Sequence, residues 1–119
     1  MSMLLVAAML GAAEPSRTAE LEYDRGSLAF EALVQGDLRL AERQLAEAGP
    51  GIRNDPAWLL NYGQMLARSG RVNEASAVFR RVADAPDGEI VLASGEVTGT
   101  REASRRALQR LRLSGISSR

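Results

Sequence analysis

The chain contains no cysteine, no histidine and no lysine among its 119 residues. Without cysteine it forms no disulfide bond and offers no thiolate to a metal. Without histidine it lacks both the commonest metal ligand and the commonest general base. Serines are present, but neither histidine nor lysine is available to activate one as a nucleophile. The glycines of segment 95–100 lack the Gly-Lys-Ser/Thr ending of a phosphate-binding loop. These absences predict a non-enzyme that holds no metal and no cofactor.

All 15 basic residues are arginine, and 15 acidic residues balance them, so net charge gives no reason to expect a nucleic-acid partner. The charge is nevertheless unevenly placed. Residues 14–55 carry nine acids and five arginines, whereas residues 101–119 carry six arginines and one acid. The C-terminal stretch is interpreted as the solvated face of a terminal helix. The alternatives are a patch for an acidic partner or for anionic lipid headgroups, and ion pairing between the ends of one molecule or of two.

An uncharged apolar run, MLLVAAMLGAA, occupies residues 3–13. It is too short to span a membrane, which takes about 20 apolar residues, and it has the length of a signal-peptide core. Gly11 and Ala13 are small, as signal peptidase requires, so we expect cleavage between Ala13 and Glu14 and a periplasmic or secreted protein. The residues before the run lack the Lys or Arg that a signal peptide normally carries. An apolar N-terminal helix packed on the domain of a cytoplasmic protein is the alternative.

Two stretches of the chain repeat each other with a spacing of 34 residues. The matched pairs are Gly36 and Gly70, Ala41 and Ala75, and Ala29 and Gly63. A fixed period of this length is typical of stacked helical hairpins. A small residue on each helix lets two antiparallel backbones approach, which predicts that Gly63 faces Ala75 and that Ala29 faces Ala41.

Apolar periodicity and capping residues predict two helical hairpins, over about 20–49 and 55–86. The first helix is expected over 20–35, with Gly36 as its stop and Asp37 as the N-cap of the second helix. Asp55 and Pro56 are a strong helix start, because Asp caps free N–H groups and Pro has its φ already set.

The period changes after Pro86. Segments 89–93 and 96–98 are short and β-prone, and Ser94-Gly95 between them resembles a two-residue hairpin turn. Thr100 is expected to cap a last, arginine-rich helix. Residues 87–119 are therefore predicted to be a β-hairpin and a helix that cap the hairpins in place of a third repeat.

Residues 56–86 resemble a tetratricopeptide repeat (TPR). The matching residues are Leu59, Tyr62, Gly63, Leu66, Gly70, Ala75, Phe79 and Pro86. The family usually has a Trp at the position of Leu59, whereas here Trp58 stands one residue early. Residues 22–49 resemble a more degenerate copy through Leu28, Ala29, Gly36-Asp37, Ala41, Leu45 and Ala48. The resemblance implies a mainly α fold, a TPR-like α-solenoid of stacked antiparallel hairpins.

Members of this family bind peptides or protein surfaces in a concave groove lined by the first helix of each hairpin. The resemblance therefore implies groove residues Tyr23, Ser27, Phe30 and Val34 from the first copy, and Leu60, Asn61, Gln64 and Arg68 from the second. The alternative is that these side chains simply face solvent. Trp58 is interpreted as a core or hairpin-packing residue in preference to an exposed anchor. Gly26, Phe30 and Leu60 stand where chaperone-tail-binding members have charged or amide residues, so that ligand is not expected.

The sequence thus predicts an exported protein that binds another protein or a peptide without chemistry and has no membrane span after processing. Its exclusively arginine basic residues and its many alanines suit a GC-rich bacterial genome, and hence a bacterial periplasm. A structural accessory subunit of a cell-envelope assembly, of the secretion or pilus type, is the second hypothesis. A membrane-surface protein that binds through its last helix is the third. A homo-oligomer is compatible with each of them.

Overall fold

The computed structural model describes residues 6–9, 28–49 and 51–117, and this part of the chain is mainly helical with a small antiparallel sheet. The helices are α2 (Phe30–Gln35), α3 (Leu38–Glu47), α4 (Pro56–Arg68), α5 (Val72–Asp84) and α6 (Thr100–Ser117). The strands are β1 (Val6–Met9), β2 (Glu89–Leu92) and β3 (Val97–Gly99), in the order β1-β2-β3.

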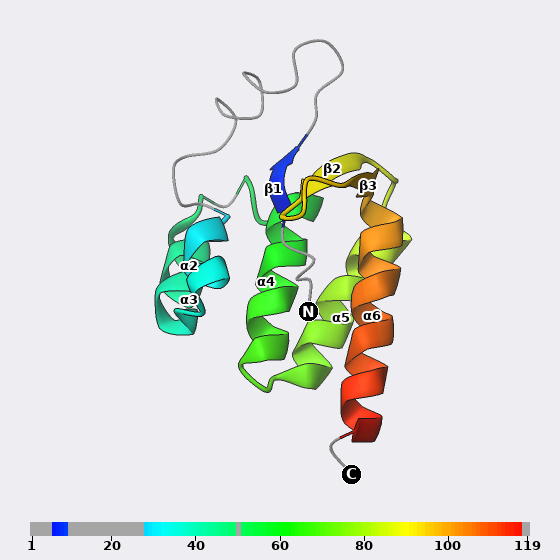
Figure 1. The fold of residues 1–119 in the computed structure, drawn as a ribbon. Helices are drawn as coiled ribbons and strands as arrows, with labels where there is room; N and C mark the ends of the chain where they lie inside the picture. The colour runs from blue at the N-terminus through cyan, green and yellow to red at the C-terminus, as the bar shows by residue number, and fades with distance from the viewer. Residues whose placement is uncertain (1–5, 10–27, 50, 118–119) are drawn as a thin grey trace.

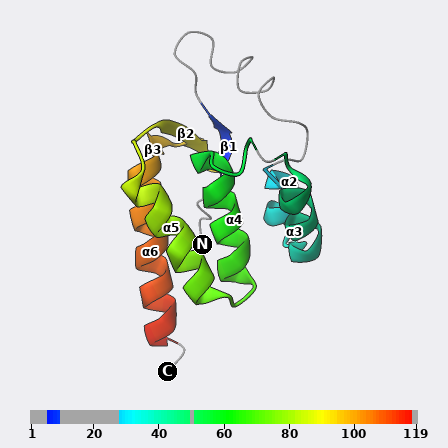
Figure 2. The same cartoon turned by 180° about the vertical axis from the view of Figure 1, so that it is seen from behind.

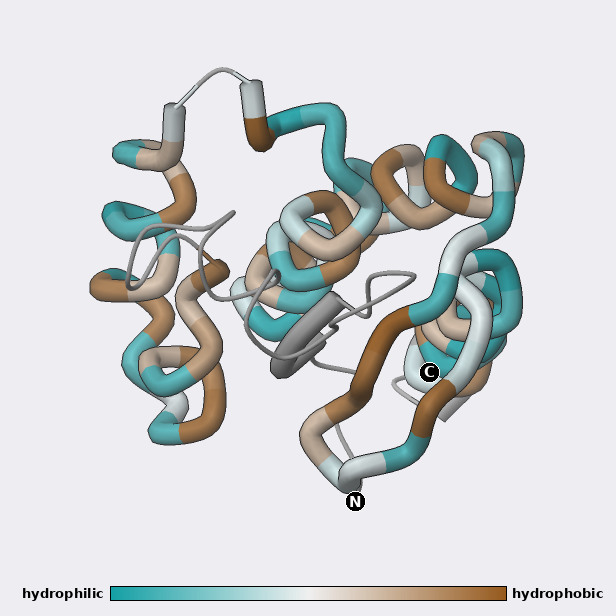
Figure 3. The backbone as a smooth tube through the Cα atoms, turned by 90° about the horizontal axis from the view of Figure 1, so that it is seen from above, coloured by the Kyte–Doolittle hydropathy of each residue, from teal (hydrophilic) through white to brown (hydrophobic). Residues whose placement is uncertain are grey.

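Helices α4, α5 and α6 lie side by side, with the strands across one end and the α2–α3 pair on the far side of α4 (Figure 1). The view from behind shows the same order (Figure 2). Viewed from above, hydrophilic and hydrophobic segments alternate around the helical coils, as expected for amphipathic helices (Figure 3). The apolar faces meet in one buried cluster, to which every helix and strand β2 contribute.

The 34-residue repeat is visible in the backbone of the two helix ends. Gly36 and Gly70 both adopt left-handed backbone, with φ of 79° and 83°. The residue after each glycine donates its N–H to the carbonyl five residues earlier, at 2.9 Å in both copies. These are the bonds of a Schellman motif, whose left-handed position glycine occupies without steric cost. The predicted stop at Gly36 is therefore confirmed, and Gly70 ends the corresponding helix in the same way.

The predicted helix over 20–35 is wrong in part. The described helix α2 begins only at Phe30, because Ala29 has a left-handed backbone with φ of 55° that ends helical geometry on its N-terminal side. Residues 20–27 lie outside the described part of the chain. The Leu28 carbonyl, which an uninterrupted helix would direct to the Ala32 amide, accepts a hydrogen bond from Asn61 Nδ2 at 2.9 Å. Ala29 is buried and precedes α2 as its N-cap residue, and its predicted contact with Ala41 stays a prediction.

The close contact between α4 and α5 places Gly63 against Phe79. A Cβ placed on Gly63 would lie 2.5 Å from Phe79 Cε1 and 2.8 Å from Phe79 Cζ. Gly63 therefore faces the Phe79 ring, and the predicted contact between Gly63 and Ala75 stays a prediction. Ala75, one helical turn before Phe79 on α5, is fully buried too. The missing side chain at 63 makes room for an aromatic ring.

The predicted hairpin is present, but its loop has three residues and not two. Leu92 N–H donates to Glu96 O, and Gly95 N–H donates to Leu92 O, both at 2.9 Å. Gly95 has a φ of 90°. A turn followed by a left-handed residue is the usual three-residue hairpin loop, and glycine satisfies the left-handed position.

Asp87, and not Thr100, caps the last helix. Asp87 Oδ1 accepts hydrogen bonds from Arg101 N–H at 3.1 Å and from the Thr100 hydroxyl at 3.3 Å. The Thr100 hydroxyl oxygen in turn accepts Gly88 N–H at 3.1 Å. Chiefly because the Arg101 amide stabilises the charged form, the pKa of the Asp87 carboxyl lies below its usual value. The loop before β2 is thereby tied to the start of α6.

The apolar N-terminal run contributes a strand to the sheet. β1 pairs antiparallel with β2, with Val6 opposite Leu92 and Met9 opposite Ile90, and it also contacts α4. The expected alternative of an N-terminal helix is wrong at these four residues. Signal-peptide cleavage stays a prediction, and its predicted site after Ala13 lies outside the described residues.

Candidate protein-binding surfaces

Two of the predicted groove residues have no exposed surface. Leu60 and Asn61 of α4 are both fully buried, so the interpretation of these two as partner-contacting residues is corrected. The reason is that α4 is enclosed: it packs against α3, α5, α6 and β1. Asn61 holds the backbone at Leu28, as described above, and is therefore a structural residue between the two hairpins.

The other predicted groove residues differ in how exposed they are. Gln64 is half-buried, and Phe30 is half-buried against the core. Arg68 is exposed and donates from Nη1 to the Leu33 carbonyl, so it bridges α4 and α2. Val34 is exposed on α2. Tyr23 and Ser27 lie outside the described residues.

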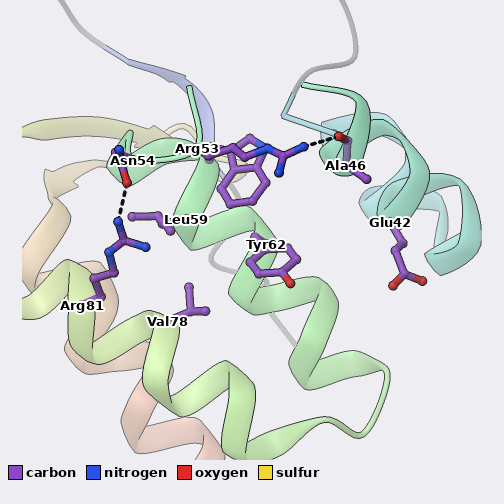
Figure 4. A pocket seen from close by; sticks show the side chains of 9 residues that line it. Glu42, Ala46, Arg53, Asn54, Leu59, Tyr62, Val78 and Arg81 are labelled. Atoms are coloured by element: carbon purple, nitrogen blue, oxygen red, sulfur yellow. Dashed lines mark hydrogen bonds between the residues drawn. The ribbon is translucent and has the colours of Figure 1, made fainter. Parts of the chain in front are cut away.

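A different hollow lies where α3, α4 and α5 converge. Its volume is about 360 Å³, and Figure 4 shows its lining. The lining residues are Glu42, Ala46, Arg53, Asn54, Trp58, Leu59, Tyr62, Val78 and Arg81. We call this hollow the junction pocket, because its walls come from both hairpins and from the connection between them.

The floor of the junction pocket is aromatic. The rings of Trp58 and Tyr62 stack with centroids 4.8 Å apart and planes inclined by 22°. Trp58 is only 6% exposed, and its Nε1 donates to the Leu45 carbonyl of α3 at 3.2 Å. The interpretation of Trp58 as a hairpin-packing residue is therefore confirmed. Tyr62, one helical turn later, is half-buried and offers the more accessible ring.

Charged side chains surround this floor. Arg53 donates from Nη2 to the Ala46 carbonyl at 2.6 Å, and Arg81 donates to Asn54 Oδ1. Figure 4 shows these two arginines reaching across the pocket from the α3–α4 connection and from α5. A guanidinium carries five N–H donors, so both arginines keep donors for another acceptor. Glu42 is 3.2 Å from Arg71 Nη1, and this ion pair offsets part of its charge.

Sequence reasoning placed Trp58 and Val78 on helices but missed the pocket. Arg53 and Asn54 follow the Gly49-Pro50-Gly51 break, where the sequence gives no direction for a side chain. A usable signal was the spacing of Trp58 and Tyr62, which places two aromatic rings on one helix face. Which face stays open depends on where α3 lies, and α3 is positioned by contacts distant in the sequence.

Comparisons with protein-family models, with curated proteins and with solved structures find no match to this chain. Within residues 6–9, 28–49 and 51–117, no helix is both long enough and apolar enough to cross a membrane.

Proposed function

We propose that the chain is a non-catalytic protein-interaction module of the TPR type, exported to the periplasm, and that it binds a segment of a partner protein in the junction pocket. The repeated Schellman motifs and the Gly63–Phe79 contact support the TPR-type arrangement. The observation that carries the binding site is the stacked Trp58–Tyr62 pair at the floor of a 360 Å³ hollow.

The lining of the junction pocket selects the partner's chemistry. Its aromatic floor and the apolar Leu59 and Val78 favour an apolar side chain. Arg53 and Arg81 favour a carboxylate beside it, because planar guanidinium groups pair well with carboxylates. The ligand we propose is therefore a peptide segment that presents an apolar residue next to Asp or Glu.

Two positions on α5 allow a matched test. Val78 lines the pocket, whereas Val72 is exposed on the same helix outside it. A photo-crosslinking residue at 78 should capture one specific partner in cells, and the same residue at 72 should not. Arg81→Glu should abolish that capture by reversing the charge at the rim. Equal capture from both positions, or capture that survives Arg81→Glu, would contradict the proposed site.

Export is tested separately. Mass spectrometry of the protein recovered from cells should find an N-terminus at Glu14. A protein that begins at Met1 would remove the export part of the proposal and leave the pocket unaffected.

A further inference from the structure

The outer edge of β2 is covered by a strand from the segment that sequence analysis assigns to a signal peptide. β1 lies next to β2 in the sheet order and runs antiparallel to it. The pairing is irregular, because the register shifts between Val6 and Ala8. β1 also contacts α4, so it covers both a strand edge and a helix.

The directions of the backbone N–H and C=O groups of β2 show which of them face β1. Leu92 N–H donates to Glu96 O on the β3 side of the hairpin. Backbone groups of successive residues in an antiparallel strand point to opposite edges, so the Val91 N–H and C=O point to the edge where β1 lies. Val91 is opposite Ala8 in that pairing. Without β1 this edge presents unpaired backbone groups beside Ile90 and Leu92, which are both buried.

We propose that the outer edge of β2 is a strand-acceptor site, and that β1 is an internal occupant which an extended segment of a partner protein replaces. The partner segment is uncharged, apolar and rich in small residues, and it runs antiparallel to β2, because that is the chemistry and direction of the segment seated there. This inference rests on the proposed export, since cleavage after Ala13 is the event that removes β1. The binding mode is addition of a strand to a sheet edge, in which backbone hydrogen bonds supply affinity.

The test uses a full-length chain that has folded before it is cut. A protease recognition sequence is placed within residues 14–27, the folded protein is cleaved, and the released segment is removed by gel filtration. A fluorescent peptide of residues 1–13 is the probe. The cleaved protein should bind the probe, and the uncut protein should bind it at least tenfold more weakly, because its own β1 competes at high effective concentration.

Probe variants test the register without changing the protein. Ala8→Pro removes an N–H that points to β2 and should weaken binding roughly tenfold. Met9→Pro removes an N–H that points away and is the matched control. On the protein, Val91→Pro should weaken binding of the probe. Val97→Pro, at the open edge of β3, should not, because Val97 pairs with Val91 and its N–H points away from β2.

Four results would overturn the proposal. The first two are equal binding of the probe to cut and uncut protein, and equal effects of the two proline substitutions in the probe. The other two are unfolding of the cut protein once the segment is removed, and an uncut protein that forms a dimer which Val91→Pro converts to monomer. The last would identify a second copy as the occupant. An N-terminus at Met1 in cells would refute export, whereas this peptide test would still report on the β2 edge.

Discussion

Replacing Gly63 with alanine has two opposing effects on the stability of the protein, and the typical magnitude of each is known. In a helix interior alanine is favoured over glycine by about 1 kcal/mol, so an unobstructed substitution would stabilise the protein. Here the new Cβ would lie 2.5 Å from Phe79 Cε1, whereas carbon atoms normally pack about 3.5–4.0 Å apart. The Phe79 ring must therefore move by about 1 Å or more.

Phe79 cannot make that movement freely. Its side chain is only 1% exposed and packs within the core. Overpacking of this kind costs about 1–3 kcal/mol, which exceeds the gain in helix propensity. We expect Gly63→Ala to lower the free energy of unfolding by about 1–2 kcal/mol. Urea unfolding followed by the fluorescence of Trp58, the chain's one tryptophan, measures this directly.

A second substitution identifies the cause. Phe79→Leu removes the ring atoms that the new Cβ would meet, so the double variant should be more stable than the sum of the single effects by roughly 1–2 kcal/mol. Gly63→Ala that is as stable as the parent, or a double variant that shows simple additivity, would refute the steric argument.

Three further changes test other contacts. Asn61→Ala should lower the free energy of unfolding by about 1–3 kcal/mol in the same urea assay, because it leaves the buried Leu28 carbonyl without this donor. The pKa of Asp87 is lowered on folding, so its stabilising effect is present above its unfolded value of about 3.9 and is lost as the pH falls through the folded value. Asp87→Asn should therefore flatten the loss of stability as the pH falls below about 4, and an unchanged acid profile would count against this role. Gly99→Ala should also destabilise the protein, measured by its melting temperature, because a Cβ there would lie 2.8 Å from Asp87 Oδ1 and would displace the carboxylate from Arg101.

The second helical hairpin could be predicted from the sequence because its signals act locally. Asp55 accepts the Ala57 amide at 2.9 Å two residues away, and Gly70 needs only its own backbone freedom. Such contacts span a few residues, so a single sequence contains both partners in one window.

The errors occur where the deciding partner is distant in the chain. Helix α2 starts only after Ala29, and the Leu28 carbonyl just before it accepts a hydrogen bond from Asn61, 33 positions away. The cap of α6 comes from Asp87, 14 positions before Arg101. Strand β1 forms because β2, more than 80 positions later, offers an edge. Local propensity carries no information about these pairs.

The position of the candidate site could not be predicted from the sequence. The TPR resemblance indicated protein binding, but it placed the groove on a face of α4 that contains the buried Leu60 and Asn61. The junction pocket lies on another face, and its rim arginines come from a connection and from α5. A hollow of this sort is set by how helices pack, which sequence periodicity does not specify.

Helix α4 attaches the first copy of the 34-residue repeat to the rest of the protein. Three α4 side chains donate hydrogen bonds to backbone carbonyls of the first copy: Trp58 to Leu45, Asn61 to Leu28, and Arg68 to Leu33. A backbone carbonyl accepts such a bond whatever its own side chain is, so the first copy can vary in sequence and stay attached. The donors cannot vary in the same way, because the loss of any one removes a link between the hairpins. The same helix supplies both rings of the junction-pocket floor. Trp58 thus has two roles, because it attaches the first copy through Leu45 and also forms part of the floor of the proposed binding site.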